Sequence, residues 1–255
     1  MFNVPDGRAT TLYIRAFHRR QAPLERVFAK GVKRIYKKQF ALAAKTVEQG
    51  IDRDAEDAIG ETLGELREVF KFNYRRIAQV FSDWTLDEFA KHEGLKSIKA
   101  PKDDFWIAFD NFVEVETAIK IVIVAESQRK LIRDIIRKGT KEGLSHKLIA
   151  KDIMAKSEVV SRYKAVRIAR TEVHNVSNYA VQSQIKATGR RATKEWSHSN
   201  DERVRTKKFN HKVNEIVNVN EPFVETGEEM DHPGSSMGSA GNVCNCRCVA
   251  KYHIR

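Results

Sequence analysis

Apolar and basic residues recur along residues 23–47 with the spacing of a helix that is apolar on one side. The apolar side holds Leu24, Phe28, Ile35 and Leu42, and the opposite side holds Arg26, Lys30, Lys33 and Lys37. Intervals of three, four or seven residues are typical of an amphipathic helix. The pattern therefore predicts a helix from Pro23 to about Val47 that buries one face and presents a basic stripe on the other.

Two further stretches, at about residues 52–81 and 103–138, show the spacing of apolar residues that is typical of helices. The first spans about residues 52–81, and its apolar positions are Ala55, Ile59, Leu63, Leu66, Phe70 and Ile77. We expect a short helix and a connection after it, ending at Pro101. Residues 103–138 also favour a helix, although the segment IKIVIVA at 119–125 is rich in β-branched residues and leaves a strand open.

The sequence after residue 138 predicts two helices and then a change of character. A glycine stop precedes Ser145, a plausible N-cap for a short helix, and a long helix follows over about 162–187, closed by Gly189. The apolar face of that helix is Val166, Ala169, Val173, Val176 and Ala180. Beyond Gly189, EWSHS, EIVNVNEPFVETG and NVCNCRCVAKYHI show the short alternation of strands, and residues 231–242 favour a loop.

These elements predict an α+β fold with a mainly helical N-terminal body of long helices and a small β-rich C-terminal module. We expect a basic N-terminal arm at 1–22 and a helical domain at 23–138 whose first helix is basic and amphipathic. The third part is a module at 139–255, with helices at 144–187 and β-rich structure at 190–255.

The net charge of +12 is concentrated near the N-terminus. Residues 8–45 hold eleven Lys and Arg against the single acid Glu25, a balance of +10. Such a segment is typical of contact with an acidic partner, either double-stranded DNA through non-specific phosphate contacts or an acidic protein surface. A solvated face with mobile counterions is the alternative. The expected contact residues are Arg19, Arg20, Arg26, Lys30, Lys33, Arg34, Lys37 and Lys38.

The apolar runs are short. The N-terminal segment lacks the apolar centre of a signal peptide, and the longest apolar run, IVIVA at 121–125, is far shorter than a bilayer span. We therefore expect a soluble protein made in the cytoplasm, with no membrane partner.

The three cysteines, Cys244, Cys246 and Cys248, occupy alternate positions. In an extended strand they would share one face, and a disulfide two residues apart would be strained. Two sulfurs on one zinc ion lie about 3.8 Å apart, whereas positions i and i+2 of a flat strand are about 6.6 Å apart, so chelation needs a bend. The remaining ligands would come from distant histidines, and the candidates are His198, His211 and His232.

Three interpretations of the cysteines stay open. They are small side chains packed in a core, the most common setting of free cysteine. They bind zinc, with Cys246, Cys248 and His211 as ligands. Or one of them is a nucleophile with His211 or His232 as its base. The first predicts no cofactor, and the second predicts a zinc ion.

An ordered set of residues over about 139–250 resembles the phage Mu protein F-like family, minor head proteins of the phage head-morphogenesis group. The set begins with RIARTEVHNVSNYA at 167–180 and ends with Asn245–Cys248. Its members are Arg170, Thr171, Glu172, His174, Asn178, Trp196, Asp201, Arg203, Arg205, His211, Asn245, Cys246, Arg247 and Cys248, with Phe223, Gly227, Pro233 and Gly234 between them. DHPG at 231–234 departs from the more usual proline-glycine-aspartate, Cys244 is an extra cysteine, and residues 1–138 carry no motif of the family.

The resemblance implies a structural protein of tailed-phage heads, made in the host cytoplasm and carried in the virion. Members are present in few copies, at the portal vertex or inside the capsid, and assist head assembly and DNA packaging or delivery. The implied partners are the portal protein or the capsid interior and the packaged DNA, and an oligomer on the particle is open. No catalytic residue is implied.

The polar motif residues also have a structural interpretation. Arg170, His174 and Asn178 are four apart and share one flank of the 162–187 helix, with Glu172 on the other. We expect a buried Arg–carboxylate pair that docks this helix onto the β module, with Asp201 the partner of Arg170 or Arg203. The alternative function is a metal-dependent nuclease or transferase that uses Asp201, His211 and the cysteines. Nucleophile-elbow and P-loop patterns are absent from the sequence.

Overall fold

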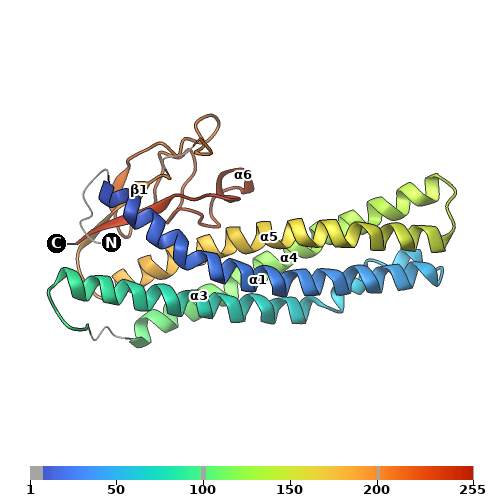
Figure 1. Cartoon of the computed structure of the whole chain (residues 1–255), viewed down its shortest axis with the longest axis horizontal. Coiled ribbons are helices and arrows are strands. Elements are labelled where there is room, and N and C mark those ends of the chain that lie inside the picture. The colour runs from blue at the N-terminus through green and yellow to red at the C-terminus, as the bar shows by residue number, and fades with distance from the viewer. Residues whose placement is uncertain (1–7, 99–101, 200–201, 255) are drawn as a thin grey trace. The chain divides into compact units, whose positions relative to one another are not determined.

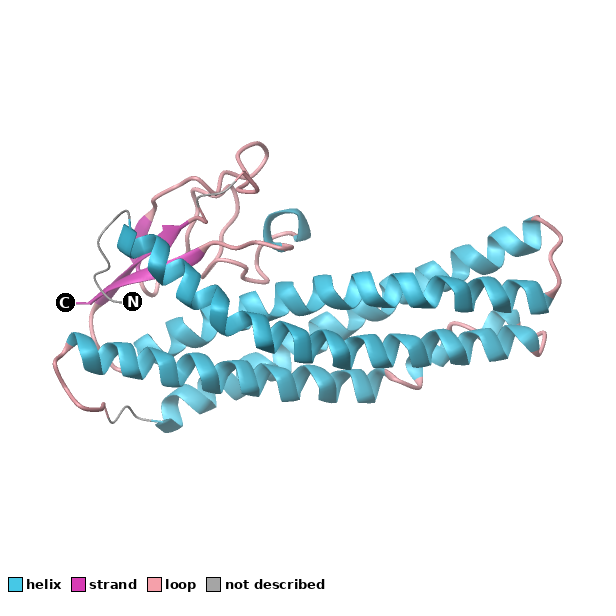
Figure 2. Ribbon diagram, in the orientation of Figure 1, coloured by secondary structure: helices cyan, strands magenta, loops and turns pink. Residues whose placement is uncertain are grey.

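The computed structural model describes residues 8–98, 102–199 and 202–254. Its helices are α1 (Arg8–Glu48), the 3-10 turn η1 (Asp52–Asp54), α2 (Asp57–Gly60), α3 (Leu63–His92), α4 (Lys102–Lys141), α5 (His146–Ala187) and α6 (Ala240–Val243). Its strands are β1 (Ala192–Ser197), β2 (Ile216–Asn218) and β3 (Val249–Ile254) (Figures 1 and 2). The chain is 67% helical, with a small antiparallel sheet near its C-terminal end, which confirms the predicted α+β class.

The chain forms two compact units. The sheet unit comprises Met1–Glu25, Tyr74–Phe112 and Arg170–Arg255, and the helical unit comprises Arg26–Asn73 and Val113–Ala169. The boundaries predicted at residues 22 and 138 fall inside α1 and α4. Residues 8–22, predicted as an arm, instead belong to α1, and Pro23 lies within that helix.

The helical unit is built around an apolar core contributed by α1, α2, α4 and α5. Its buried residues include Phe40, Val47, Ile59, Ile132, Ile149 and Ile153. Gly139 permits a close approach to α5, because a Cβ at this position would lie 2.6 Å from Cγ1 of Ile149. A pair of helices this close tolerates only the smallest residue at the contact.

In the sheet unit, β1 is the central strand of the order β2-β1-β3, and both pairings are antiparallel. Lys194 faces Val217 on one side, and Trp196 faces Ala250 on the other. The N-terminal turns of α1 reach this sheet, since the Tyr13 hydroxyl donates a 3.0 Å hydrogen bond to the carbonyl oxygen of Ala250. Phe17, Phe81 and Trp84 pack beside Tyr13 in an aromatic core.

Several predicted elements differ from the structure. The strand left open at 119–125 does not form: these residues are helical, as favoured for 103–138, because Ile121, Val124, Ala125 and Ile132 are buried at helical intervals on α4. The two helices predicted around 145–187 are one helix, α5. The helix predicted at 52–81 is instead η1, α2 and then α3, which continues to His92 through the segment predicted as a connection. Gly189, with φ +68°, follows the end of α5 as predicted.

None of the helices in the described ranges combines the length and the apolarity needed to cross a lipid bilayer.

Candidate functional site

The cysteine segment bends instead of forming the predicted strand. Helix α6 ends at Val243, and Asn245 adopts a left-handed conformation with φ +55°. The N–H of Cys246 donates to the carbonyl oxygen of Val243 at 3.0 Å, and β3 starts only at Val249. Asparagine tolerates this conformation better than most residues, so Asn245 provides the bend that the strand prediction lacked.

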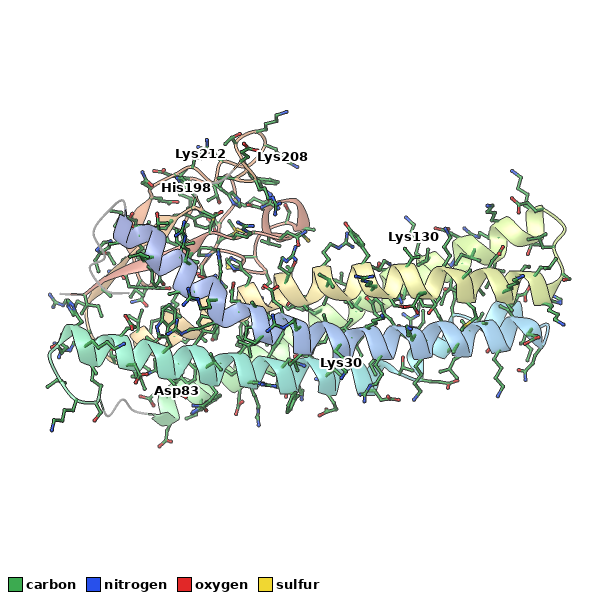
Figure 3. All side chains as sticks on the ribbon, in the orientation of Figure 1. Lys30, Asp83, Lys130, His198, Lys208 and Lys212 are labelled. Carbon is green, nitrogen blue, oxygen red and sulfur yellow. The ribbon has the colours of Figure 1, made fainter. Side chains whose placement is uncertain are left out.

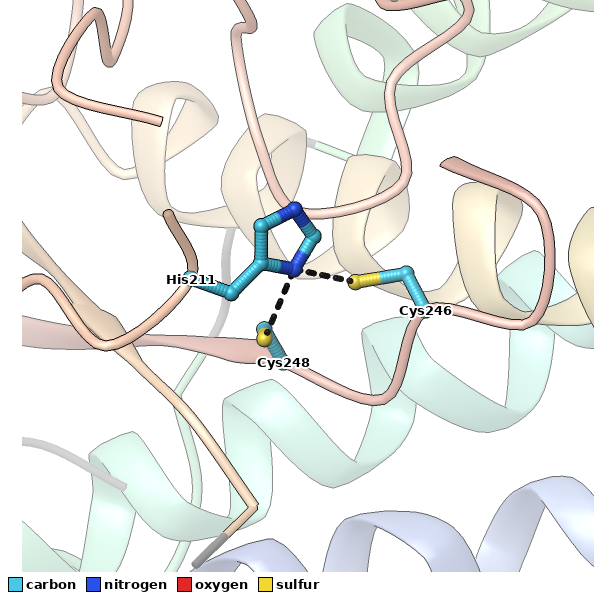
Figure 4. Close-up of side chains that lie close together, drawn as sticks. All are labelled: His211, Cys246 and Cys248. Atoms are coloured by element: carbon cyan, nitrogen blue, oxygen red, sulfur yellow. Dashed lines mark hydrogen bonds between the residues drawn. The ribbon is translucent and has the colours of Figure 1, made fainter. Parts of the chain in front are cut away.

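The bend places two thiols against one imidazole. His211 Nδ1 lies 3.6 Å from Sγ of Cys246 and 3.5 Å from Sγ of Cys248. Dashed lines in Figure 4 mark the two contacts. The three atoms lie within 4.8 Å of one another, and all three residues are at most 3% exposed. Among the described residues, only His211, Cys246 and Cys248 form such a group, which we call the His–Cys–Cys cluster. Cys244 is only half-buried and lies outside it.

The imidazole is held from its far side. His211 Nε2 donates a hydrogen bond to Oδ1 of Asn242, and Nδ2 of Asn242 donates to Oε2 of Glu228 at 3.1 Å. The same carboxylate oxygen accepts the N–H of Ser239 at 2.7 Å. Because Glu228 accepts from the Asn242 amide, Asn242 presents its oxygen to His211. The proton of the neutral imidazole is thus on Nε2, and the lone pair of Nδ1 is directed at the two sulfurs.

Other motif residues surround the cluster. The Trp196 ring on β1 packs edge-on against His211 and Phe223, each at 5.3 Å between ring centres. The Arg205 guanidinium donates to the carbonyl oxygen of Cys244, and Thr171 Oγ1 on α5 accepts the N–H of Asn245 at 3.3 Å. The motif residues thus converge on one place in the sheet unit.

A cavity of about 600 Å³ opens beside the cluster. Its lining includes His18, Glu25, Arg170, His174 and Arg203, together with the three cluster residues. All of these belong to the sheet unit. The cluster is therefore buried from bulk solvent but borders a space large enough for a small molecule.

His174 is fixed on the cavity wall by α1, α5 and the 231–234 loop. Its Nδ1 lies 3.4 Å from Nε2 of Gln21, and its Nε2 lies 3.3 Å from Nδ2 of Asn178. Gly234 has φ +84°, and a Cβ there would lie 2.7 Å from Cδ2 of His174. The Pro-Gly of the family motif therefore serves a close contact with the histidine of the helix motif.

The two thiols of the cluster differ in acidity. The hydrogen bond from Cys248 lowers the pKa of Cys246 well below its ordinary value, and hydrogen bonds with His174 and His211 lower it further against the opposing effect of burial. The same Cys246–Cys248 hydrogen bond and burial raise the pKa of Cys248.

The prediction that Arg170 forms a buried ion pair with a carboxylate is wrong. Arg170 is 45% exposed at its side chain, and its Nε lies 3.8 Å from Oε2 of Glu25 on α1. Glu172 is buried and accepts a 2.6 Å hydrogen bond from the Tyr74 hydroxyl on α3. Arg203 is exposed and lines the cavity, and Asp201 lies outside the described residues.

Two of the histidines considered as ligands do not join the cluster. His198 is half-buried, and His232 is buried with Nδ1 3.3 Å from the carbonyl oxygen of Pro233. Arg247 contributes its backbone, because its carbonyl oxygen lies 3.1 Å from Nε2 of His18. The interpretation of the cysteines as core residues agrees with the burial of Cys246 and Cys248 but not with the half-buried Cys244, and it does not include the contact of the two buried thiols with His211.

The predicted basic contact residues divide into two groups. Lys33 and Lys37 pair with Glu158, Lys38 pairs with Glu65, and the Arg20 guanidinium stacks over Trp84. The second group is exposed and has no ion pair within the described residues; it comprises Arg19, Arg26, Lys30 and Arg34. Figure 3 labels Lys30 on α1. Only the second group keeps its charge available for a partner.

Sequence reasoning missed several residues that complete the site. Asn242 and Glu228 orient His211, and His18 contacts the cysteine segment from α1. Glu195 on β1 forms a largely buried network with Lys251 at 2.6 Å and His253 at 2.8 Å on β3. The position of Asn242, two residues before Cys244, was the one visible signal, while Glu228 and His18 are too distant in sequence to have been found.

A family model matches residues 130–251 of the chain. That model is described as Phage Mu protein F like protein. The match confirms the resemblance drawn from the motif residues for the C-terminal part of the chain. It suggests a phage head morphogenesis protein, a virion component made in the host, and the family is generally structural. Curated proteins and solved structures give no match.

Proposed function

We propose that this protein is a minor head protein of a tailed bacteriophage that assists head assembly and DNA packaging or delivery. The single observation that carries the proposal is the family match over residues 130–251. In this proposal the protein acts at the portal vertex or inside the capsid, in contact with the portal protein or the capsid interior.

The packaged DNA is the second partner in the proposal. Arg19, Arg26, Lys30 and Arg34 are exposed basic side chains without an internal ion pair among the described residues. Such side chains gain free energy from phosphates by releasing condensed counterions, and they carry no sequence information. Binding of this kind would be indifferent to base sequence and sensitive to salt.

Quantitative mass spectrometry of purified particles tests the proposal. The chain should be present in a few copies per full virion. Equal copy number in particles that have ejected their DNA would indicate a fixed component near the portal, and loss on ejection would indicate a protein delivered with the DNA. Absence from both kinds of particle would overturn the assignment to the mature head.

A metal-dependent nuclease or transferase is the second candidate, because the His–Cys–Cys cluster borders a cavity that also holds Arg170 and Arg203. Positively charged side chains beside a metal ion are suited to phosphate substrates. Nicking of supercoiled DNA with added zinc or manganese, abolished by His211→Ala, would support this candidate. No nicking by a metal-loaded wild-type protein would reject the nuclease, and no transfer product with a labelled donor would reject the transferase.

A further inference from the structure

We propose that His211 Nδ1, Cys246 Sγ and Cys248 Sγ together bind one zinc ion, with the fourth coordination position facing the cavity. This inference concerns the metal chemistry of the chain itself and does not depend on the proposed role in the phage head.

The ligand spacing already fits a tetrahedral ion. Zinc–sulfur bonds of about 2.3 Å and a zinc–nitrogen bond of about 2.0–2.1 Å place N and S about 3.6 Å apart at a tetrahedral angle. The two observed distances from Nδ1 to the sulfurs are 3.6 Å and 3.5 Å. Zinc can therefore bind Nδ1 and either sulfur at the observed N–S distances, and the two sulfurs, which lie within 4.8 Å of each other, would be about 3.8 Å apart on the ion.

The imidazole is prepared as a ligand. Metal-bound histidine usually donates its other ring N–H to a fixed acceptor, which sets the tautomer and the ring orientation. Asn242 is that acceptor, and Glu228 fixes Asn242 in turn. Any buried imidazole needs an acceptor for its N–H, and here the support also fixes the tautomer that leaves Nδ1 free toward the two sulfurs.

The donor set selects zinc over harder ions. Two thiolates and an imidazole are soft or borderline ligands, which favour zinc over Mg²⁺ and Ca²⁺. Two buried thiolates would repel each other and lack solvation, so the ion also supplies the charge that lets both lose their protons. The sum of Zn²⁺, two thiolates and one neutral imidazole is zero.

The fourth position is left for a water molecule. No other His, Cys, Asp or Glu of the described residues completes the cluster. The nearby His174 hydrogen-bonds Cys246, but its ring nitrogens also lie against Gln21 and Asn178, and it is not one of the three residues of the cluster. Three protein ligands with one open position is the arrangement of zinc sites that do chemistry, whereas closed four-ligand sites are structural.

The test begins with the purified full-length protein. Elemental analysis should find about one zinc per chain, and replacement by Co²⁺ should give the intense visible bands of tetrahedral cobalt with thiolate charge transfer. Cys246→Ser and Cys248→Ser should each lose the metal and these bands. Cys244→Ser is the matched control and should keep both, because Cys244 lies two positions away but outside the cluster.

A second variant keeps the test decisive if the cysteine variants do not fold. Asn242→Ala leaves all three ligands in place and should weaken zinc binding by about 10–100-fold, measured by competition with a chelator. Folding is followed by far-ultraviolet circular dichroism. Unchanged affinity in Asn242→Ala, no zinc in a wild type reconstituted under reducing conditions, or a Cys246–Cys248 disulfide in freshly purified protein would each overturn the proposal. None of these results depends on whether the protein is found in phage particles.

Discussion

The Tyr74 hydroxyl on α3 donates a 2.6 Å hydrogen bond to the Glu172 carboxylate on α5, and both side chains are buried. Glu172 belongs to the helix motif of the family, yet its partner lies almost a hundred residues earlier.

Tyr74→Phe removes one donor from a buried acid and should lower the free energy of unfolding by about 1.5–3 kcal/mol. Chemical denaturation measures this loss. Tyr163→Phe, at an exposed position of α5, is the control and should change stability by less than about 0.5 kcal/mol. Equal stability of the two variants would contradict the role given to the pair.

Arg170→Ala should have a small effect, contrary to what a buried pair would predict. Its side chain is 45% exposed and its contact with Glu25 is 3.8 Å long, so the loss should be about 0–1 kcal/mol. Trp196→Ala gives the contrast, because this fully buried ring should cost about 3–5 kcal/mol. Melting temperatures of the two variants show which replacement lowers stability more. A larger loss for Arg170→Ala than for Trp196→Ala would restore the idea of a buried charge pair.

Gly234→Ala should destabilise the sheet unit more than a Gly→Ala replacement whose only cost is the positive φ of the backbone. The new Cβ would meet Cδ2 of His174 at 2.7 Å in a backbone of φ +84°. We expect a loss of about 2–3 kcal/mol from strain and displacement of His174. Gly94→Ala is the matched control, with φ +69° and no atom within 4 Å of the added Cβ, and should cost about 1 kcal/mol. An equal loss in the free energy of unfolding in both variants would mean that the His174 side chain moves aside without cost.

His232 should make the protein less stable in mild acid. Burial lowers the pKa of His232 from 6.5 to about 3, against the hydrogen bond with Pro233 and with the help of the charge on Lys194. As the pH falls below 6.5, His232 becomes protonated in the unfolded chain, whereas in the folded chain it stays neutral until about pH 3. The free energy of unfolding therefore decreases across this window. Between pH 7 and pH 5 the wild type should lose about 2 kcal/mol more than His232→Leu. Urea unfolding at both values tests this, and parallel losses would reject it.

Charge reversal on α1 should weaken DNA binding. The triple variant Arg26→Glu, Lys30→Glu, Arg34→Glu removes three exposed, unpaired bases and should lower affinity for a random duplex at least tenfold. It should also reduce the slope of log affinity against log salt by about 3. The control variant reverses three exposed bases of α4 and α5, namely Lys130, Lys147 and Lys151; Figure 3 labels Lys130. Equal losses in the two variants would show that only net charge matters.

The sequence predicted the helices well wherever their apolar spacing was regular, because burial on one face is a local property of the chain. The boundaries were less predictable: α3 extends to His92 since Trp84 and Phe89 are buried by distant partners. The run at 119–125 was ambiguous because β-branched residues favour a strand locally, whereas burial against distant segments makes it a helix.

The candidate site was only partly visible. His211, Cys246 and Cys248 could be named from residue type, but the left-handed Asn245 that brings them together could not, because many residue types occupy turns. The contact of Arg170 with Glu25 could not be predicted, because Glu25 lies 145 residues away and no sequence pattern connects the two, and the expected partner Asp201 lies outside the described residues. Asn242 lies close to the cysteines in sequence, but its pairing with His211 and Glu228 is a tertiary contact that no local pattern predicts.

The hydrogen bond between Tyr13 and Ala250 has a consequence for the order of folding. It spans 237 positions, so the sheet unit needs the first and the last described segments of the chain at once. During synthesis, every segment of the helical unit is available once Ala169 has emerged, while the Tyr13 hydroxyl must wait for β3 to form its hydrogen bond. Contacts between such distant segments form slowly. A chain released before residue 250 would therefore leave the Tyr13 hydroxyl without its acceptor and one edge of β1 without its partner strand.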